Sequence, residues 1–347
     1  MSNSSVTEED IGYFASTTNI LVKPMANFTV MFYIHGIYTV LFIISLHILI
    51  CRQDCPNRVF YMLFTIVLFT LTSAYNAVQT FGYASQATLE FTFTKNQDWA
   101  SFLAFLQHND AKTIILGFEM VLPLCLVTMA DLMPLHHCYV IWGSSKWIAF
   151  PFIFMVLSLA ICEIVASAFV VIGASNTADP AKVQLYLQGD TIDTAFWLAD
   201  MGVNIILTLL TGQSHLICEN LTLTYFLQLV EYAIILESGI LYPIFVIAGI
   251  VYSELAYPED HGSTPFDLLA VSYQIAGIAP TLIIIWAASG KTVEYTNANQ
   301  AMSSLHFANG AAPGSTNSNT RPHVQTVDIE ARVSVERIHY PDEGNSV

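Results

Sequence analysis

Six carboxyl side chains interrupt stretches of sequence that are otherwise apolar. They are Glu119, Asp131, Glu163, Asp200, Glu231 and Glu237. A carboxylate at bilayer depth is costly, and such groups usually face a bundle interior or a water-filled cavity. The stretches that carry these acids contain no lysine or arginine. Each acid is therefore expected to be protonated, to accept hydrogen bonds from neutral donors, or to contact water.

A polar stripe follows one face of the stretch 191–218. Its members are Asp193, Trp197, Asp200, Asn204, Thr208, Thr211 and His215. Steps of three and four residues put all of them on one side of a helix. The stripe is either a water-accessible path or ligand-binding wall, or a seam of hydrogen bonds between helices.

Two of the acids lie near the middle of their apolar stretches, Glu163 in 147–173 and Glu237 in 224–254. A protonated carboxyl bonded to neutral groups, a proton-coupled site and a site for a cationic ligand are the three alternatives. After Glu237, Gly239 allows close backbone approach and Pro243 removes a helical hydrogen bond. The candidate ligand-binding or proton-sensing residues are Glu119, Glu163, Asp200, Asn204, Glu237 and Tyr242.

Seven long apolar stretches must position these side chains. They run over about 28–51, 58–83, 113–142, 147–173, 191–218, 224–254 and 265–289. Each is near or above the roughly 20 residues that cross a bilayer as a helix. Charged residues make up 11% of the chain, against about 25% in soluble domains. The prediction is an all-α, seven-transmembrane-helix bundle over 28–290, after an exterior segment 1–27 and before a disordered cytoplasmic tail 291–347.

Two features on the N-terminal side of the bundle indicate its orientation in the membrane. Asn3 and Asn27 each begin a glycosylation sequon. Long loops are expected over 84–112 and 174–190, on the same side as the N-terminus. Lysine and arginine are nearly balanced between the two sides and decide little. We predict an exterior N-terminus, a cytoplasmic C-terminus and a place in the plasma membrane.

Several functional classes are excluded by residues that the chain lacks. A net charge of −16 argues against nucleic acid as a partner. A retinal protein needs a lysine inside the bundle, and no stretch supplies one there. His47, His136, His137 and His215 include no His-x-x-x-His pair, so we expect interfacial histidines and no metal site. The catalytic motifs of common enzymes are also missing, and we expect neither enzymatic activity nor a cofactor.

Three segments resemble one group of proteins: 137–143 (HCYVIWG), 237–242 (ESGILY) and 277–284 (GIAPTLII). They are similar to the uncharacterised seven-span integral membrane proteins that are abundant in mushroom-forming fungi. The resemblance covers the third to seventh stretches best and implies the same seven-span fold. It implies no activity, because the group has none that is settled. The group usually has arginine where this chain has His137 and Trp286.

The predicted fold and its acids lead to three hypotheses about function. The first is a receptor-like sensor that binds a small ligand in the bundle interior and relays a shift to a cytoplasmic effector. The second is a proton-coupled transporter or carrier that uses the same acids. The third is a membrane scaffold without a small-molecule site. The lipid bilayer is the expected partner in all three.

Overall fold

The computed structural model describes residues 16–51, 57–141, 146–218, 239–252 and 267–286. Over these ranges every regular element is a helix, and six helices are long and apolar enough to cross a membrane. The predicted all-α membrane fold is thereby confirmed, and the chain is a multi-pass membrane protein. Of the predicted stretch 224–254, only the helix Gly239–Tyr252 is described. A seven-helix bundle therefore stays a prediction.

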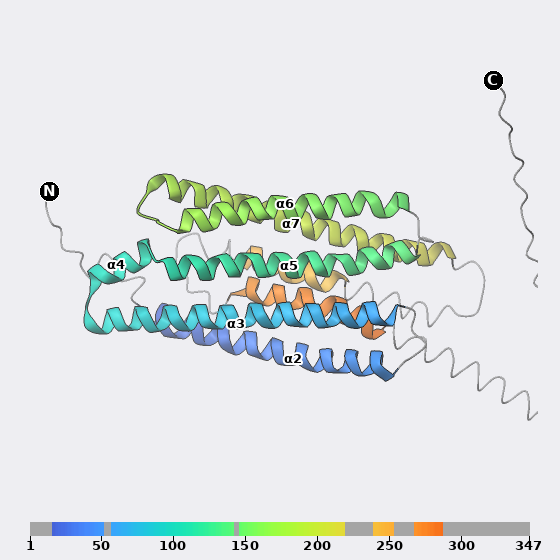
Figure 1. The fold of residues 1–347 in the computed structure, drawn as a ribbon, viewed down its shortest axis with the longest axis horizontal. Helices are drawn as coiled ribbons and strands as arrows, with labels where there is room; N and C mark the ends of the chain where they lie inside the picture. Colours follow the sequence, from blue (N-terminus) through green and yellow to red (C-terminus); the bar gives the residue numbers. More distant parts are fainter. Residues whose placement is uncertain (1–15, 52–56, 142–145, 219–238, 253–266, 287–347) are drawn as a thin grey trace, which may run out of the picture. The chain divides into compact units, whose positions relative to one another are not determined.

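The long helices α2, α3, α5, α6 and α7 alternate in direction along the chain (Figure 1). The order is η1 (Thr18–Val22), α2 (Lys23–Cys51), α3 (Arg58–Asn96), α4 (Trp99–Gln107), α5 (Asp110–Ile141), α6 (Lys146–Ala174) and α7 (Pro180–Cys218). Two further helices span Gly239–Tyr252 and Leu268–Trp286. In the bundle α3 contacts α2 and α5, and α6 contacts α5 and α7. The segment 1–15, which contains Asn3, and the predicted tail 291–347 lie outside the described residues.

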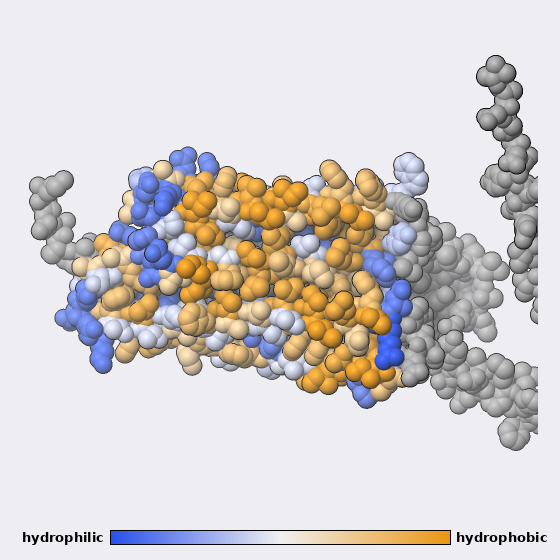
Figure 2. Space-filling model, in the orientation of Figure 1, coloured by the Kyte–Doolittle hydropathy of each residue, from blue (hydrophilic) through white to orange (hydrophobic). Residues whose placement is uncertain are grey.

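The outer surface of the bundle suits a lipid environment. Figure 2 shows a hydrophobic band along the middle of one face, with hydrophilic residues gathered toward the two ends. On α6, for example, the Phe154 and Ile161 side chains are 66% and 62% exposed. Apolar side chains outside and polar ones inside are the arrangement expected of a membrane bundle.

The helix Leu268–Trp286 forms the centre of the bundle, because most of its residues are buried. The Tyr273 ring contacts Tyr75 on α3 and Trp197 on α7, each with a centroid distance of 5.1 Å. A Cβ atom added at Gly277 would lie 2.8 Å from Thr72 Oγ1 and 3.1 Å from the Tyr38 hydroxyl. The central helix therefore packs directly on α2, α3 and α7.

Glycines bring α6 and α7 into close contact. A Cβ at Gly173 on α6 would lie 2.5 Å from the Tyr186 backbone nitrogen on α7. A Cβ at Gly189 on α7 would in turn lie 2.8 Å from the Val170 nitrogen on α6. Small residues at such a seam let two membrane helices approach backbone to backbone.

The two predicted exterior loops are wrong, because the structure is largely helical there. α3 continues to Asn96, α4 occupies Trp99–Gln107, and α7 begins at Pro180. A 39-residue α3 is about 58 Å long, whereas the hydrocarbon core of a bilayer is about 30 Å thick. Falling hydropathy after residue 83 marks the membrane edge, but a helix ends only where capping residues or helix breakers occur.

The turns between these helices show such caps. The Asp98 carboxylate accepts a hydrogen bond from the Ser101 backbone nitrogen at 3.1 Å and begins α4. Hydrogen bonds from Ser101 also lower the pKa of the Asp98 carboxyl. At α7 the Asp179 carboxylate accepts from the Ala181 nitrogen at 3.0 Å, next to Pro180 in the first turn. Acidic caps and an early proline both favour helix starts.

Candidate functional site

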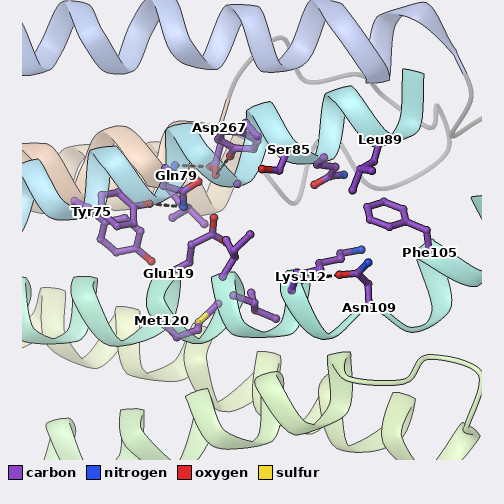
Figure 3. Close-up of a pocket in the computed structure, with 18 of the residues that line it drawn as sticks. Tyr75, Gln79, Ser85, Leu89, Phe105, Asn109, Lys112, Glu119, Met120 and Asp267 are labelled. Carbon is purple, nitrogen blue, oxygen red and sulfur yellow. Dashed lines mark hydrogen bonds between the residues drawn. The ribbon is translucent and has the colours of Figure 1, made fainter. Parts of the chain in front are cut away.

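A cavity of about 350 Å³ lies where α3, α5 and α7 extend toward α4 (Figure 3). Residues of these helices form its walls, together with Asp267, Leu269 and Tyr273 beside and within the central helix. Small-molecule sites commonly have volumes of about 300–1,000 Å³ and an apolar lining with a few polar groups. The cavity fits that description in both size and composition.

The charge of the lining is strongly unbalanced. Four carboxyl side chains line the cavity: Glu119, Asp190, Asp193 and Asp267. Lys112 is the one basic side chain among the described lining residues, and its Nζ atom lies 5.9 Å from the centre of the Phe105 ring. Among the described residues Lys112 makes no ion pair with any of the four acids. The cavity is therefore electronegative.

Glu119 projects from α5 toward α3 into this space (Figure 3). A Cβ atom at Gly82 on α3 would lie 2.8 Å from Glu119 Oε1, so the glycine leaves room for the carboxyl. In the described part of the chain no residue donates a hydrogen bond to the Glu119 carboxyl. Its polar atoms are thus open to whatever fills the cavity.

Aromatic side chains close the inner end of the cavity. Tyr75 and Tyr273 line it and pack edge to face, and we call this pair the aromatic floor. The Gln79 amide donates to the Tyr75 hydroxyl at 3.0 Å. Behind the floor, Trp197 contacts Tyr273 and donates from Nε1 to Asp193 Oδ1 at 3.1 Å.

Asp267 is held at the end of the central helix. Its carboxylate accepts from the Leu269 backbone nitrogen at 2.9 Å and from the Tyr83 hydroxyl at 3.5 Å. Its own backbone nitrogen donates to Asn27 Oδ1 at 2.6 Å. Asn27 is buried, with 7% of its surface exposed. A glycan needs an exposed asparagine amide, so this burial disfavours the predicted glycosylation at Asn27 in the folded protein.

A second polar cluster lies deeper in the bundle, and we call it the carboxyl network: Asp131, Asp200, Asn204 and Tyr242. The Asn204 amide donates to Asp131 Oδ1 at 2.8 Å, and the Tyr242 hydroxyl donates to Asp200 Oδ2 at 2.9 Å. The Asp131 and Asp200 carboxyls lie side by side in this network. Two carboxylates have no donor between them, so the pair must share a proton. All four side chains are buried.

A second carboxyl pair connects α6 with α7. Glu163 is 3% exposed and accepts from the Ser167 hydroxyl at 3.3 Å. Its carboxyl also lies beside that of Asp193. The buried Glu163 Oε2 atom has no donor among the described residues. The contact with Asp193 therefore also requires a shared proton.

The predicted site residues fall into separate groups. Asp200, Asn204 and Tyr242 meet in the carboxyl network, whereas Glu119 lines the cavity. Glu163 reaches the cavity only through Asp193. Glu237 and Glu231 lie outside the described residues, as do the side chains of Thr211 and His215. The rest of the stripe on α7 faces inward, and no cluster of metal-ligating side chains occurs in the described part of the chain.

The α3 wall of the cavity was missed from the sequence. It contains Tyr75, Gln79, Tyr83 and Gln86, which follow steps of four, four and three residues. This is the helical spacing that revealed the stripe on α7. The spacing runs past residue 83, where the apolar stretch ends, so it did not predict one continuous helical face.

The chain was compared with known families, proteins and structures. No protein family model, curated protein or solved structure matches the chain.

Proposed function

We propose that this membrane protein binds a small ligand in the cavity between α3, α5 and α7, as a receptor-like sensor. The observation that carries the proposal is a ligand-sized space whose lining includes an unsatisfied carboxyl, Glu119. Specific sites place a few polar groups in a mostly apolar enclosure, as this one does. With the N-terminus outside, as we propose, the cavity belongs to the exterior half of the protein.

A physical connection runs from the cavity to the carboxyl network. A ligand on the aromatic floor contacts Tyr273, which packs on Trp197. Trp197 and Asp200 belong to one face of α7, and Asp200 accepts from Tyr242 on the next described helix. Movement of the floor therefore changes the packing of α7 against the helix Gly239–Tyr252. A cytoplasmic effector would respond to such a shift in the inner half of the bundle.

Filling the cavity tests this proposal. Ser85 lines the space and is exposed to it, so a phenylalanine there occupies volume without removing a carboxyl. In a thermal-stability screen of a small-molecule library against the purified chain, we expect compounds that raise the melting temperature of the wild type. The same compounds are expected to have no effect on Ser85→Phe.

The matched control is Thr88→Phe, one turn further along α3. Thr88 is exposed and does not line the cavity. Every compound that fails to raise the melting temperature of Ser85→Phe should raise that of Thr88→Phe as much as that of the wild type. A library without any stabilising compound, or compounds that stabilise Ser85→Phe as strongly as the wild type, would contradict the proposal and favour the scaffold hypothesis.

A proton-coupled carrier is the second candidate, and the two carboxyl pairs favour it. Asp131 with Asp200, and Glu163 with Asp193, each need a shared proton to form the contacts observed. Buried pairs of this kind are common in proton relays. A carrier reconstituted in liposomes shows solute flux driven by a pH gradient, whereas a receptor shows none.

A further inference from the structure

We infer that the ligand of the cavity is a small organic cation, an amine whose ammonium group pairs with Glu119 and whose body is apolar or aromatic. The inference rests on the ligand-binding function proposed above and adds the chemical class of the ligand. Three observations carry it: the sign of the lining charge, the unsatisfied Glu119 carboxyl, and the distribution of apolar side chains.

The sign of the charge excludes an anionic ligand. Among the described lining residues, four carboxyls face one ammonium group. A bound carboxylate or phosphate would be repelled by each ionised acid, with Lys112 to attract it. Lys112 lies near Phe105, at the end of the cavity opposite the aromatic floor (Figure 3). A cation near the floor is thus attracted by the acids and lies far from the one like charge.

Glu119 differs from the other lining acids because no described residue donates a hydrogen bond to it. Asp193 accepts from Trp197, and Asp267 accepts from the backbone of Leu269. Asp190 also has an interaction partner. Glu119 has no donor among the described residues, although its carboxyl lies in the cavity beside Gly82. A charge-assisted hydrogen bond from an ammonium group would satisfy it.

The surrounding surface favours an organic cation over a metal ion. A hard cation needs several oxygen ligands converging on one point, and the described residues contain no such group. Apolar side chains instead make up much of the lining: Leu89, Phe105, Ile115, Leu116 and Met120. The rings of the aromatic floor add cation–π attraction. An ammonium joined to an apolar body matches both kinds of surface.

Three probes of nearly equal shape separate charge from size: 2-phenylethylamine, 2-phenylethanol and 3-phenylpropanoate. Their dissociation constants are measured with the purified full chain by equilibrium dialysis. The amine is expected to bind at least tenfold more tightly than the alcohol, and the acid is expected not to bind. Glu119→Gln should weaken amine binding at least tenfold and leave alcohol binding unchanged.

Asp110→Asn is the matched control for long-range charge effects. Asp110 is exposed and does not line the cavity, although its neighbours Asn109 and Ala111 do. Amine binding by this variant should stay within twofold of wild type. An amine that binds no more tightly than the alcohol, or equally well to Glu119→Gln, overturns the inference. If library compounds still stabilise wild type and not Ser85→Phe, the ligand site stands and the cationic class alone has failed.

Discussion

Asp200→Ala is expected to lower the free energy of unfolding by about 2 kcal/mol, because it removes the centre of the carboxyl network. Asp200 is 1% exposed, accepts from Tyr242 and shares a proton with Asp131. Alanine leaves the buried Tyr242 hydroxyl without its acceptor, and Asp131 keeps only its hydrogen bond from Asn204. An unsatisfied buried polar group costs about 1–3 kcal/mol, and interhelical hydrogen bonds in membranes contribute up to about 1.7 kcal/mol. Equilibrium unfolding in mixed micelles measures the change.

Asp200→Asn separates hydrogen bonding from mere side-chain volume. The asparagine oxygen accepts from Tyr242, and its amide donates to Asp131, so every contact of the network is kept without a shared proton. Its free energy of unfolding should lie within about 0.5 kcal/mol of wild type. Equal losses for the alanine and asparagine variants would show that the network does not stabilise the bundle as described.

The second large effect is expected at the seam between α6 and α7. Gly173→Ala places a methyl group 2.5 Å from the Tyr186 nitrogen and 2.7 Å from the Lys182 carbonyl oxygen. Both are backbone atoms, so neither can move aside without displacing α7. Overpacking of this kind costs about 1–3 kcal/mol, and we expect the upper end of that range. Thermal unfolding in detergent should show a clearly lower melting temperature.

Gly202→Ala is the control, because it makes the same chemical change on α7 itself. Nothing lies within 4 Å of the added methyl group there. Alanine favours a helix over glycine by up to about 1 kcal/mol, so this variant should equal or exceed the wild type in stability. If Gly173→Ala is as stable as Gly202→Ala, the close approach of α6 and α7 is wrong.

Much of the fold could be predicted from the sequence, because lipid leaves few choices for the backbone. Long apolar runs in a bilayer must be helical, and their hydropathy located α2, α6 and the helix Leu268–Trp286 well. The same signal failed where α3 and α7 leave the membrane. Hydropathy reports contact with lipid, whereas helix ends depend on caps such as Asp98 and Asp179.

The site was harder to predict, because it depends on which helices face each other. Periodicity showed that Asp200 and Asn204 share one face of α7, and both are buried there. It could not show that Asp131 of α5 would be their partner. Glu119 was selected for its depth in an apolar stretch, and it does line the cavity. The wall opposite it, from Tyr75 to Gln86, emerges only when α3 and α5 are packed together.

The most direct measurement of the central claim, an acidic and water-accessible cavity beside α3, is thiol labelling at Ser85→Cys. A cationic and an anionic methanethiosulfonate reagent are reacted with Ser85→Cys and, as reference, with Thr88→Cys on the exposed side of α3. Reaction of the native cysteines is measured on the unsubstituted chain and subtracted. The account predicts a cation-to-anion rate ratio at least tenfold higher at Ser85→Cys than at Thr88→Cys. Equal ratios at the two positions, or no reaction at Ser85→Cys, would contradict it.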